Sequence, residues 1–308
     1  MIVDPAPVVH PAHSPEDVVR AVKHLASAPK VLPRLKRLLS DGNSSIQDIV
    51  ALVRLDMGIA ARVLKVANSV YFSKGVRSLT IGAAVERVGY NQIYEVVSYS
   101  VASQVIVRPL QTYGIDANEA WKNSVIVALA AEALAMRLGQ DRDVAYTIGL
   151  LHCIGRVAID DWATSTGQKI QLRSAGFPHD TSIAERAALG FTQADTGELL
   201  LRDWDFPDVM IGPVRWQYTP RETAEHGQMA GLLRAAKWIR SMIGASSEPF
   251  NPVALEPWQR QQLRLDSAAL TGIVAQVTAR LAEVDSLLNA GDEIAVDRQS
   301  FPSQKWGR

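Results

Sequence analysis

Apolar residues recur every three or four positions along most of this chain, which is the spacing of an amphipathic helix. Two such faces are visible in the first hundred residues: Ile46, Ile49, Val50, Val53 and then Ile59, Val63, Val66, Val70. The same spacing predicts further helices over 81–88, 121–138, 143–160, 223–243 and 266–289. No segment alternates with period two for long enough to form a sheet. The pattern therefore predicts an all-α protein.

Capping residues indicate where several of these helices begin and end. Ser14 followed by Pro15 is typical of a helix start, and the segment 44–47 resembles a capping box. Ser182 with Glu185 forms a second capping box, on a helix whose Glu185-Arg186 pair is expected to face solvent. Glycines 89, 139, 190, 244 and 291 stand where helices are expected to end.

The helical pattern of apolar residues is interrupted over 101–116, which suggests a boundary between two helical bundles in series. The chain has 308 residues, about twice the usual domain size. Pro109 and Gly114 interrupt the helical pattern, and we place the boundary near 114–117. The predicted subdomains are 14–115 and 116–291, and residues 292–308 lack periodicity and are expected to form a mobile tail.

Composition narrows the range of partners. Lys+Arg and Asp+Glu both number 32, so the net charge is zero, whereas nucleic-acid binding usually shows as a basic excess. A single cysteine excludes an internal disulfide, and the N-terminus does not have the pattern of a signal peptide. The longest apolar stretch, Val125–Met136, is too short to span a bilayer and contains Glu132. We expect a cytoplasmic protein that binds neither nucleic acid nor membrane.

Four motifs follow one another in a fixed order. The first is the helix Asp56–Ser69, which ends in Ala-Asn-Ser, and the second is Ile81–Gly89. The third is Gly149–Gly155, with the sequence GLLHCIG. The fourth is Glu185–Pro207, which holds spaced glycines, a Leu-Leu pair, Trp204 and a proline.

Together these motifs, over roughly 32–241, resemble the HDOD domain, a bacterial signalling module related to the HD-type metal phosphohydrolases. Met57 stands where the first motif usually has proline, and Cys153 stands where GLLHDIG has aspartate. The resemblance implies an all-helical fold with an HD-like C-terminal half. It also implies a role in signal transduction through protein contacts.

In HD-type enzymes, His and Asp side chains on several helices hold a metal that activates water. By position in the resemblance, only His152 retains a recognisable ligand. The other positions have become Asn123, Cys153, Gln193, Trp216 with Gln217 and, by a loose alignment, Lys237. A zinc site needs three or four protein ligands. The sequence therefore predicts neither a metal nor any other cofactor, and no catalytic residue.

Two of these residues have simple structural interpretations. His152 is expected to hydrogen-bond a nearby backbone carbonyl or Asn123, and Cys153 is expected to be a small core residue.

Other polar and aromatic residues are candidate contacts to a partner or ligand. Asn68 and Ser69 are expected either to end their helix as a buried link between the two halves or to touch a partner. Arg215 and Trp204, with Trp216, are candidates for an aromatic and cationic ligand cleft.

Three functions are compatible with these residues. The first is a non-catalytic signalling protein, not an enzyme, whose partner protein the sequence does not identify. The second is a small-ligand sensor in which Arg215 or Lys237 holds the phosphate of a nucleotide. The third is a phosphohydrolase, which rests only on His152 and on analogy of fold.

Overall fold

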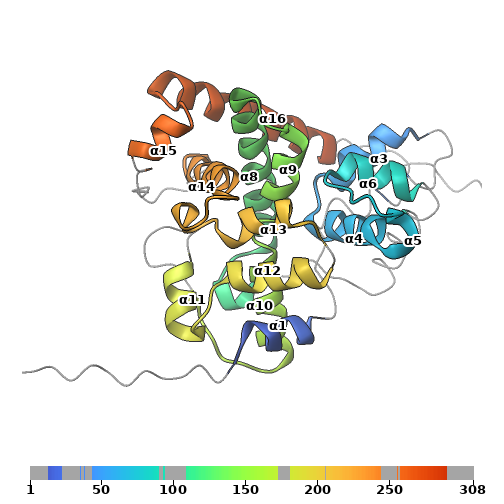
Figure 1. Cartoon of the computed structure of the whole chain (residues 1–308), viewed down its shortest axis with the longest axis vertical. Helices are drawn as coiled ribbons and strands as arrows, with labels where there is room; N and C mark the ends of the chain where they lie inside the picture. Colours follow the sequence, from blue (N-terminus) through green and yellow to red (C-terminus); the bar gives the residue numbers. More distant parts are fainter. Residues whose placement is uncertain are drawn as a thin grey trace, which may run out of the picture.

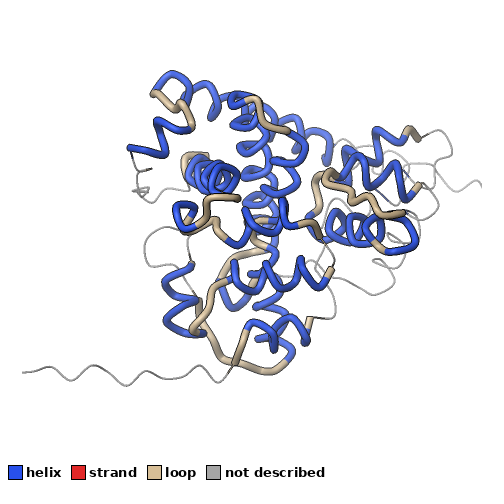
Figure 2. Tube along the Cα trace, in the orientation of Figure 1, coloured by secondary structure: helices blue, strands red, loops and turns tan. Residues whose placement is uncertain are grey.

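A computed structural model describes residues 13–22, 35, 38, 44–89, 93, 109–172, 181–204, 206–243, 255 and 257–289. Within these ranges every regular element is a helix (Figure 2), which confirms the predicted fold class. The tail 292–308 and the expected helix ends at Gly244 and Gly291 lie outside the described residues. None of the described helices combines the length and apolar character that a membrane span requires.

Two groups of helices follow each other along the chain (Figure 1). The first group consists of α3 (Ile46–Val53), α4 (Met57–Asn68), α5 (Val70–Ser73) and α6 (Ile81–Val88). The second group begins with the short helix η1 (Gln111–Tyr113) and continues with α8 (Ala117–Leu138), α9 (Arg142–Leu151), α10 (Ile154–Ser165), α11 (Ser182–Leu189) and α12 (Gln193–Asp203). It ends with α13 (Asp208–Arg215), η2 (Pro220–Glu222), α14 (Gly227–Arg240), α15 (Pro257–Gln262) and α16 (Ser267–Asn289).

The first helix of the chain, α1 (Pro15–Ala21), packs away from its neighbours in sequence. It lies against α10 and α12 of the second group (Figure 1), with Val18 fully buried. His13, just before it, meets the ring of Trp162 edge-on at 4.9 Å between centroids. The subdomain limits 14–115 and 116–291 stay a prediction, and contacts assign α1 to the second group.

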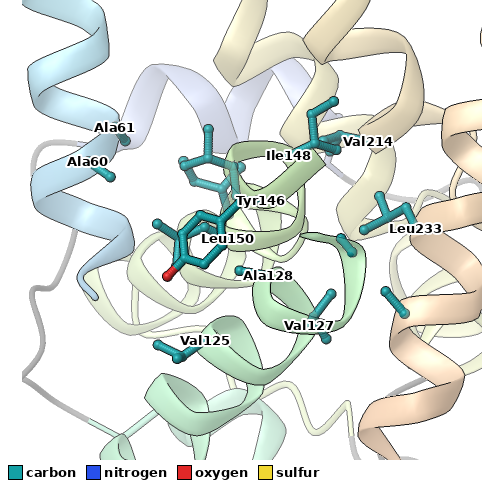
Figure 3. Close-up of a cluster of buried hydrophobic side chains, with 14 of the residues drawn as sticks. Ala60, Ala61, Val125, Val127, Ala128, Tyr146, Ile148, Leu150, Val214 and Leu233 are labelled. Atoms are coloured by element: carbon teal, nitrogen blue, oxygen red, sulfur yellow. The ribbon is translucent and has the colours of Figure 1, made fainter. Parts of the chain in front are cut away.

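Helix α8 is the centre of the second group. Nearly every residue from Asn123 to Ala135 is buried, because α9, α14 and α16 pack around it. A helix that is apolar on all sides must be covered by other helices to be shielded from water. Figure 3 shows Val125, Val127 and Ala128 of α8 beside Tyr146 and Leu150 of α9.

The predicted helix over 143–160 is two helices, so that prediction is wrong in one respect. Helix α9 ends at Leu151 and α10 begins at Ile154, which leaves His152 and Cys153 in the turn between them. Cys153 has φ −109° and ψ 18°, outside the helical region. The two side chains therefore do not occupy adjacent positions of one helix.

Glycines on both sides of this turn allow close packing. A Cβ on Gly149 would lie 2.7 Å from Cα of Ala128, and one on Gly155 would lie 1.9 Å from the carbonyl oxygen of Gln193. Helix α9 thus touches the backbone of α8, and α10 touches the backbone of α12. The turn is fixed from two sides.

Several predicted helix ends are confirmed and others shift. Ser14 caps α1, and Gly89, Gly139 and Gly190 follow α6, α8 and α11 as predicted. The cap of α3 is Ser45 with Asp48, one residue later than predicted. The N-cap of α11 is Thr181, whose side chain makes no capping hydrogen bond, so the predicted capping box of Ser182 with Glu185 is wrong.

Arg54 joins the two groups of helices. Its guanidinium lies 2.7 Å from Glu132 of α8 and 2.9 Å from Asp143 of α9, and 4.0 Å from the ring centre of Tyr146. The Tyr146 hydroxyl donates to the Arg54 carbonyl at 2.8 Å, and the Trp121 indole donates to the next carbonyl, of Leu55. In Figure 3, Ala60 and Ala61 of α4 lie on the side of Tyr146 and Leu150, so apolar packing accompanies these polar contacts.

Substituting Gly149 or Gly155 by alanine is expected to lower the free energy of unfolding by about 1–3 kcal/mol or more, because the added methyl group meets backbone. Gly231→Ala in α14 is the matched control. Its Cβ would meet nothing within 4 Å, and we expect a gain of about 0.5–1 kcal/mol. Urea unfolding of the three variants measures the difference, and equal effects would contradict the packing.

Tyr146 makes stability depend on alkaline pH. Burial raises the pKa of its hydroxyl to about 12, from 10.0. The folded state thus keeps a proton that the unfolded state loses, so this stability is complete below pH 10 and is lost as pH rises toward 12. At pH 11 the loss is about 1 kcal/mol. Tyr146→Phe should flatten the decline between pH 9 and pH 11 by that amount in urea titrations, and an unchanged slope would contradict the assignment.

Candidate functional site

The turn between α9 and α10 lies in a buried polar centre, and His152 is its first member. The side chain is 1% exposed, and its Nδ1 lies 2.7 Å from the carbonyl oxygen of Gly149. A carbonyl only accepts, so Nδ1 carries the proton. The other nitrogen, Nε2, lies 3.4 Å from the side-chain amide nitrogen of Asn123 and accepts from it. His152 thus makes both of the hydrogen bonds that the sequence predicted as alternatives.

Cys153 points into the core beside α8. It is 4% exposed, and its Sγ lies 3.3 Å from Oγ of Ser124. This matches the small buried residue that the sequence predicts.

Gln217 and Lys237 connect the turn to the last helices of the bundle. The Gln217 amide nitrogen donates to the His152 carbonyl at 3.0 Å and to the Val214 carbonyl at 2.8 Å. The Gln217 side-chain oxygen accepts from Nζ of Lys237 at 2.8 Å. This Nζ also lies 3.8 Å from the ring centre of Tyr218, a cation–π contact. Both side chains are almost completely buried.

Gln193 enters the same centre from the start of α12. Its side-chain amide donates to the Tyr218 hydroxyl at 3.0 Å, and its backbone N–H donates to Glu185 at 2.8 Å. Glu185 is fully buried and also accepts from the hydroxyl of Thr181. The prediction that Glu185 faces solvent is wrong. Its carboxylate is buried because it accepts a hydrogen bond from the backbone N–H of Gln193, at the start of α12.

Arg156 was not among the predicted site residues, yet it lies in this centre. It is 1% exposed, and its guanidinium lies 5.9 Å from the ring centre of Tyr113. Burial opposes its charged form, but Tyr218 and Glu185 outweigh that effect, so the pKa of Arg156 is raised. Burial, together with Glu185, raises the pKa of Tyr113 well above its ordinary value. One signal was available: Arg156 stands among apolar residues over 154–159, four residues before Asp160.

These side chains do not fit a metal ion. The His152 nitrogen that would bind a metal already accepts from Asn123, and the ammonium of Lys237 lies within the same network. Amide and thiol groups replace the carboxylate and imidazole ligands. Over the described ranges no three His, Cys, Asp or Glu side chains are grouped so that they could hold a metal.

The remaining candidates lie apart from this centre. Asn68 exchanges two hydrogen bonds with the backbone of Ser78, at 2.6 and 3.2 Å, and so links α4 to the segment before α6. This link is buried as predicted, but it lies inside the first group and does not join the two halves. The Ser69 hydroxyl donates to the Val66 carbonyl at the end of α4.

Arg215 and the tryptophans make contacts between helices. Arg215 of α13 forms ion pairs with Asp195 at 3.1 Å and Glu198 at 2.9 Å, both of α12, and lies over the ring of Trp216. Nζ of Lys65 lies 5.0 Å from the ring centre of Trp204, and this contact joins the first and second groups of helices. Their role as ligand or partner contacts stays a prediction.

The described residues form a helical protein in which several polar residues of the buried centre hydrogen-bond to one another. A family model described as the HDOD domain matches residues 25–220, more than half of the chain. The chain belongs to the HDOD domain family.

One protein is similar to this chain over most of its length. An uncharacterized protein of Treponema pallidum (strain Nichols) is 25% identical over 257 residues, which are 81% of this chain and 49% of that protein. The chain thus spans about half the length of this relative.

Two crystal structures share the fold at low identity. The response regulator MmoQ of Methylococcus capsulatus strain Bath has a TM-score of 0.62 at 20% identity, covering 82% of this chain and 98% of that chain. A virulence factor of Campylobacter jejuni has a TM-score of 0.63 at 17% identity, covering 87% and 99%.

Lys237 and Gln217 should behave as one energetic unit. We expect Lys237→Met to lower the free energy of unfolding by about 1–3 kcal/mol, since the Gln217 oxygen loses its donor. Gln217→Met should cost more, because it takes an acceptor from a buried ammonium. The loss of unfolding free energy in the double variant should be smaller than the sum of the two single losses by about 1 kcal/mol or more. Denaturant unfolding with exposed Arg186→Met as control measures this, and additive losses would contradict the contact.

Proposed function

We propose that this protein is a non-catalytic bacterial signalling protein that acts through protein–protein contacts of its HDOD domain. The observation that carries the proposal is the bonding of the centre. His152 shares its two nitrogens with Gly149 and Asn123, and Lys237 binds Gln217 inside the network. Among the described residues of this centre, both His152 nitrogens and the Lys237 ammonium are therefore already engaged, which supports the proposal.

The signalling role is supported by the family and by one structural neighbour. The neighbour from Methylococcus capsulatus is described as a response regulator, and its fold covers most of this chain. A fold that keeps its helices while its ligand positions change is suited to presenting a surface. The partner would be a protein of a signalling pathway, and a cytoplasmic location remains a prediction from the sequence.

The alternative functions receive less support from the contacts. A nucleotide sensor needs a cation free to meet phosphate, but Arg215 is paired with two carboxylates and Lys237 is 4% exposed. A phosphohydrolase needs a metal, and the donor set does not fit one.

Purified protein should contain no stoichiometric iron, manganese, zinc or nickel by elemental analysis. It should not hydrolyse cyclic dinucleotides or a generic phosphodiester when these metals or Mg²⁺ are added. His152→Ala should leave that background unchanged. Bound metal that disappears in His152→Ala, together with hydrolysis that disappears with it, would overturn the proposal and restore the phosphohydrolase.

A further inference from the structure

Helix α1 covers a face of the second group that α10 and α12 form together (Figure 1). Val18 is fully buried in this contact, and Val19 and Val22 are partly buried against the core. His13, just before α1, extends the contact, since its ring meets that of Trp162 on α10, a side chain that is 3% exposed. The contact between α1 and this face is therefore mainly apolar.

The polar side chains of α1 bond within the helix and its cap. Ser14 and Asp17 form the capping box, and Arg20 pairs with Asp17 at 2.7 Å and donates to the Glu16 carbonyl at 3.3 Å. Among the described residues, no hydrogen bond or ion pair joins α1 to α10 or α12. Release of α1 from the face therefore separates no hydrogen-bonded pair, and only the apolar and ring contacts oppose it.

The length and position of α1 also favour its release. The helix has seven residues, too few to stay helical in water without the contact. Terminal elements with few buried side chains open at a lower free energy than the core does. Helix α1 also precedes residue 25, where the match to the HDOD domain begins, whereas α10 and α12 lie inside the match. The face belongs to the matched domain, and its cover does not.

We infer that this face of α10 and α12 is a docking site for a helix, which α1 occupies in the free chain and which a partner's helix takes over. The seated α1 defines the chemistry of the partner's helix. It carries apolar side chains spaced as Val18, Val19 and Val22, on one side of a helix that is polar elsewhere. The inference rests on the proposed partner-binding function and names the surface that serves it.

Helix α1 then acts as an internal competitor. Because it is part of the same chain, its effective concentration at the face is high, and a partner binds only when its helix outcompetes α1. The device keeps the face covered in the absence of the partner, and this limits non-specific association of the apolar surface.

The probe is a synthetic peptide with the sequence of residues 13–22, labelled at its C-terminus. Val18→Asp in the full chain should release α1, because a carboxylate is costly to bury on an apolar face. In fluorescence anisotropy titrations, the labelled peptide should bind this variant saturably. The original chain should bind it at least about tenfold more weakly, since α1 already occupies the face.

Two controls define the contact. Arg20→Gln changes a side chain that is 74% exposed, so α1 should stay seated and the labelled peptide should bind as weakly as it binds the original chain. A peptide that itself carries Val18→Asp should bind neither the original chain nor the Val18→Asp variant. Thermal melting checks that each variant of the chain is folded.

Hydrogen exchange of the original chain tests the release of α1 without any substitution. Backbone N–H groups of α1 should exchange by local opening, at rates that low concentrations of urea leave unchanged. Those in the buried part of α8 should exchange at least about tenfold more slowly, because they open only when the whole domain unfolds.

Four outcomes would overturn the inference. The peptide could bind the Val18→Asp variant no better than the original chain, or the peptide with Val18→Asp could bind as well as the original sequence. The N–H groups of α1 could exchange together with those of α8, or Val18→Asp could unfold the whole chain, and either result would make α1 part of the core. None of these results affects the metal and hydrolysis assays, so failure of the docking site is distinguishable from failure of the non-catalytic proposal.

Discussion

The contact between the backbones of α8 and α9 determines the rest of the polar centre. Because residue 149 has no side chain, α9 lies directly on Ala128, and His152 three residues later is held beside Asn123. On the other side, Gly155 lets α10 lie on α12, and this places Gln193 and Glu185 near Arg156. The two glycines of the GLLHCIG segment thus let α9 and α10 pack closely against α8 and α12.

Once the helices are so close, the chemistry of the centre follows from hydrogen bonding. Most buried donors and acceptors have a hydrogen-bond partner, and removing the partner leaves a buried polar group unpaired, which lowers stability. Asn123 supplies a donor to the His152 nitrogen, and Gln217 ties the His152 carbonyl to Lys237. A buried ammonium also repels a divalent cation. These contacts support the proposal that the centre does not hold a metal.

Local sequence signals predicted the helices well because capping and periodicity act over a few residues. Ser14, Gly139 and Gly190 mark helix ends where they were expected. The break at His152 and Cys153 was missed because its causes are the backbones of α8 and α12, which are remote in sequence. The buried positions of Glu185 and Arg156 likewise depend on the segment that packs opposite them.

The central claim is that His152 has its two nitrogens bonded within the protein. Nitrogen-15 NMR of the histidine side chains, with His152→Gln to assign the signal, measures the protonation of each ring nitrogen directly. We predict that Nδ1 carries the proton, that Nε2 does not, and that added Mn²⁺ or Zn²⁺ leaves the His152 signals unchanged. A signal from Nε2 that shifts or broadens with stoichiometric metal would contradict the account.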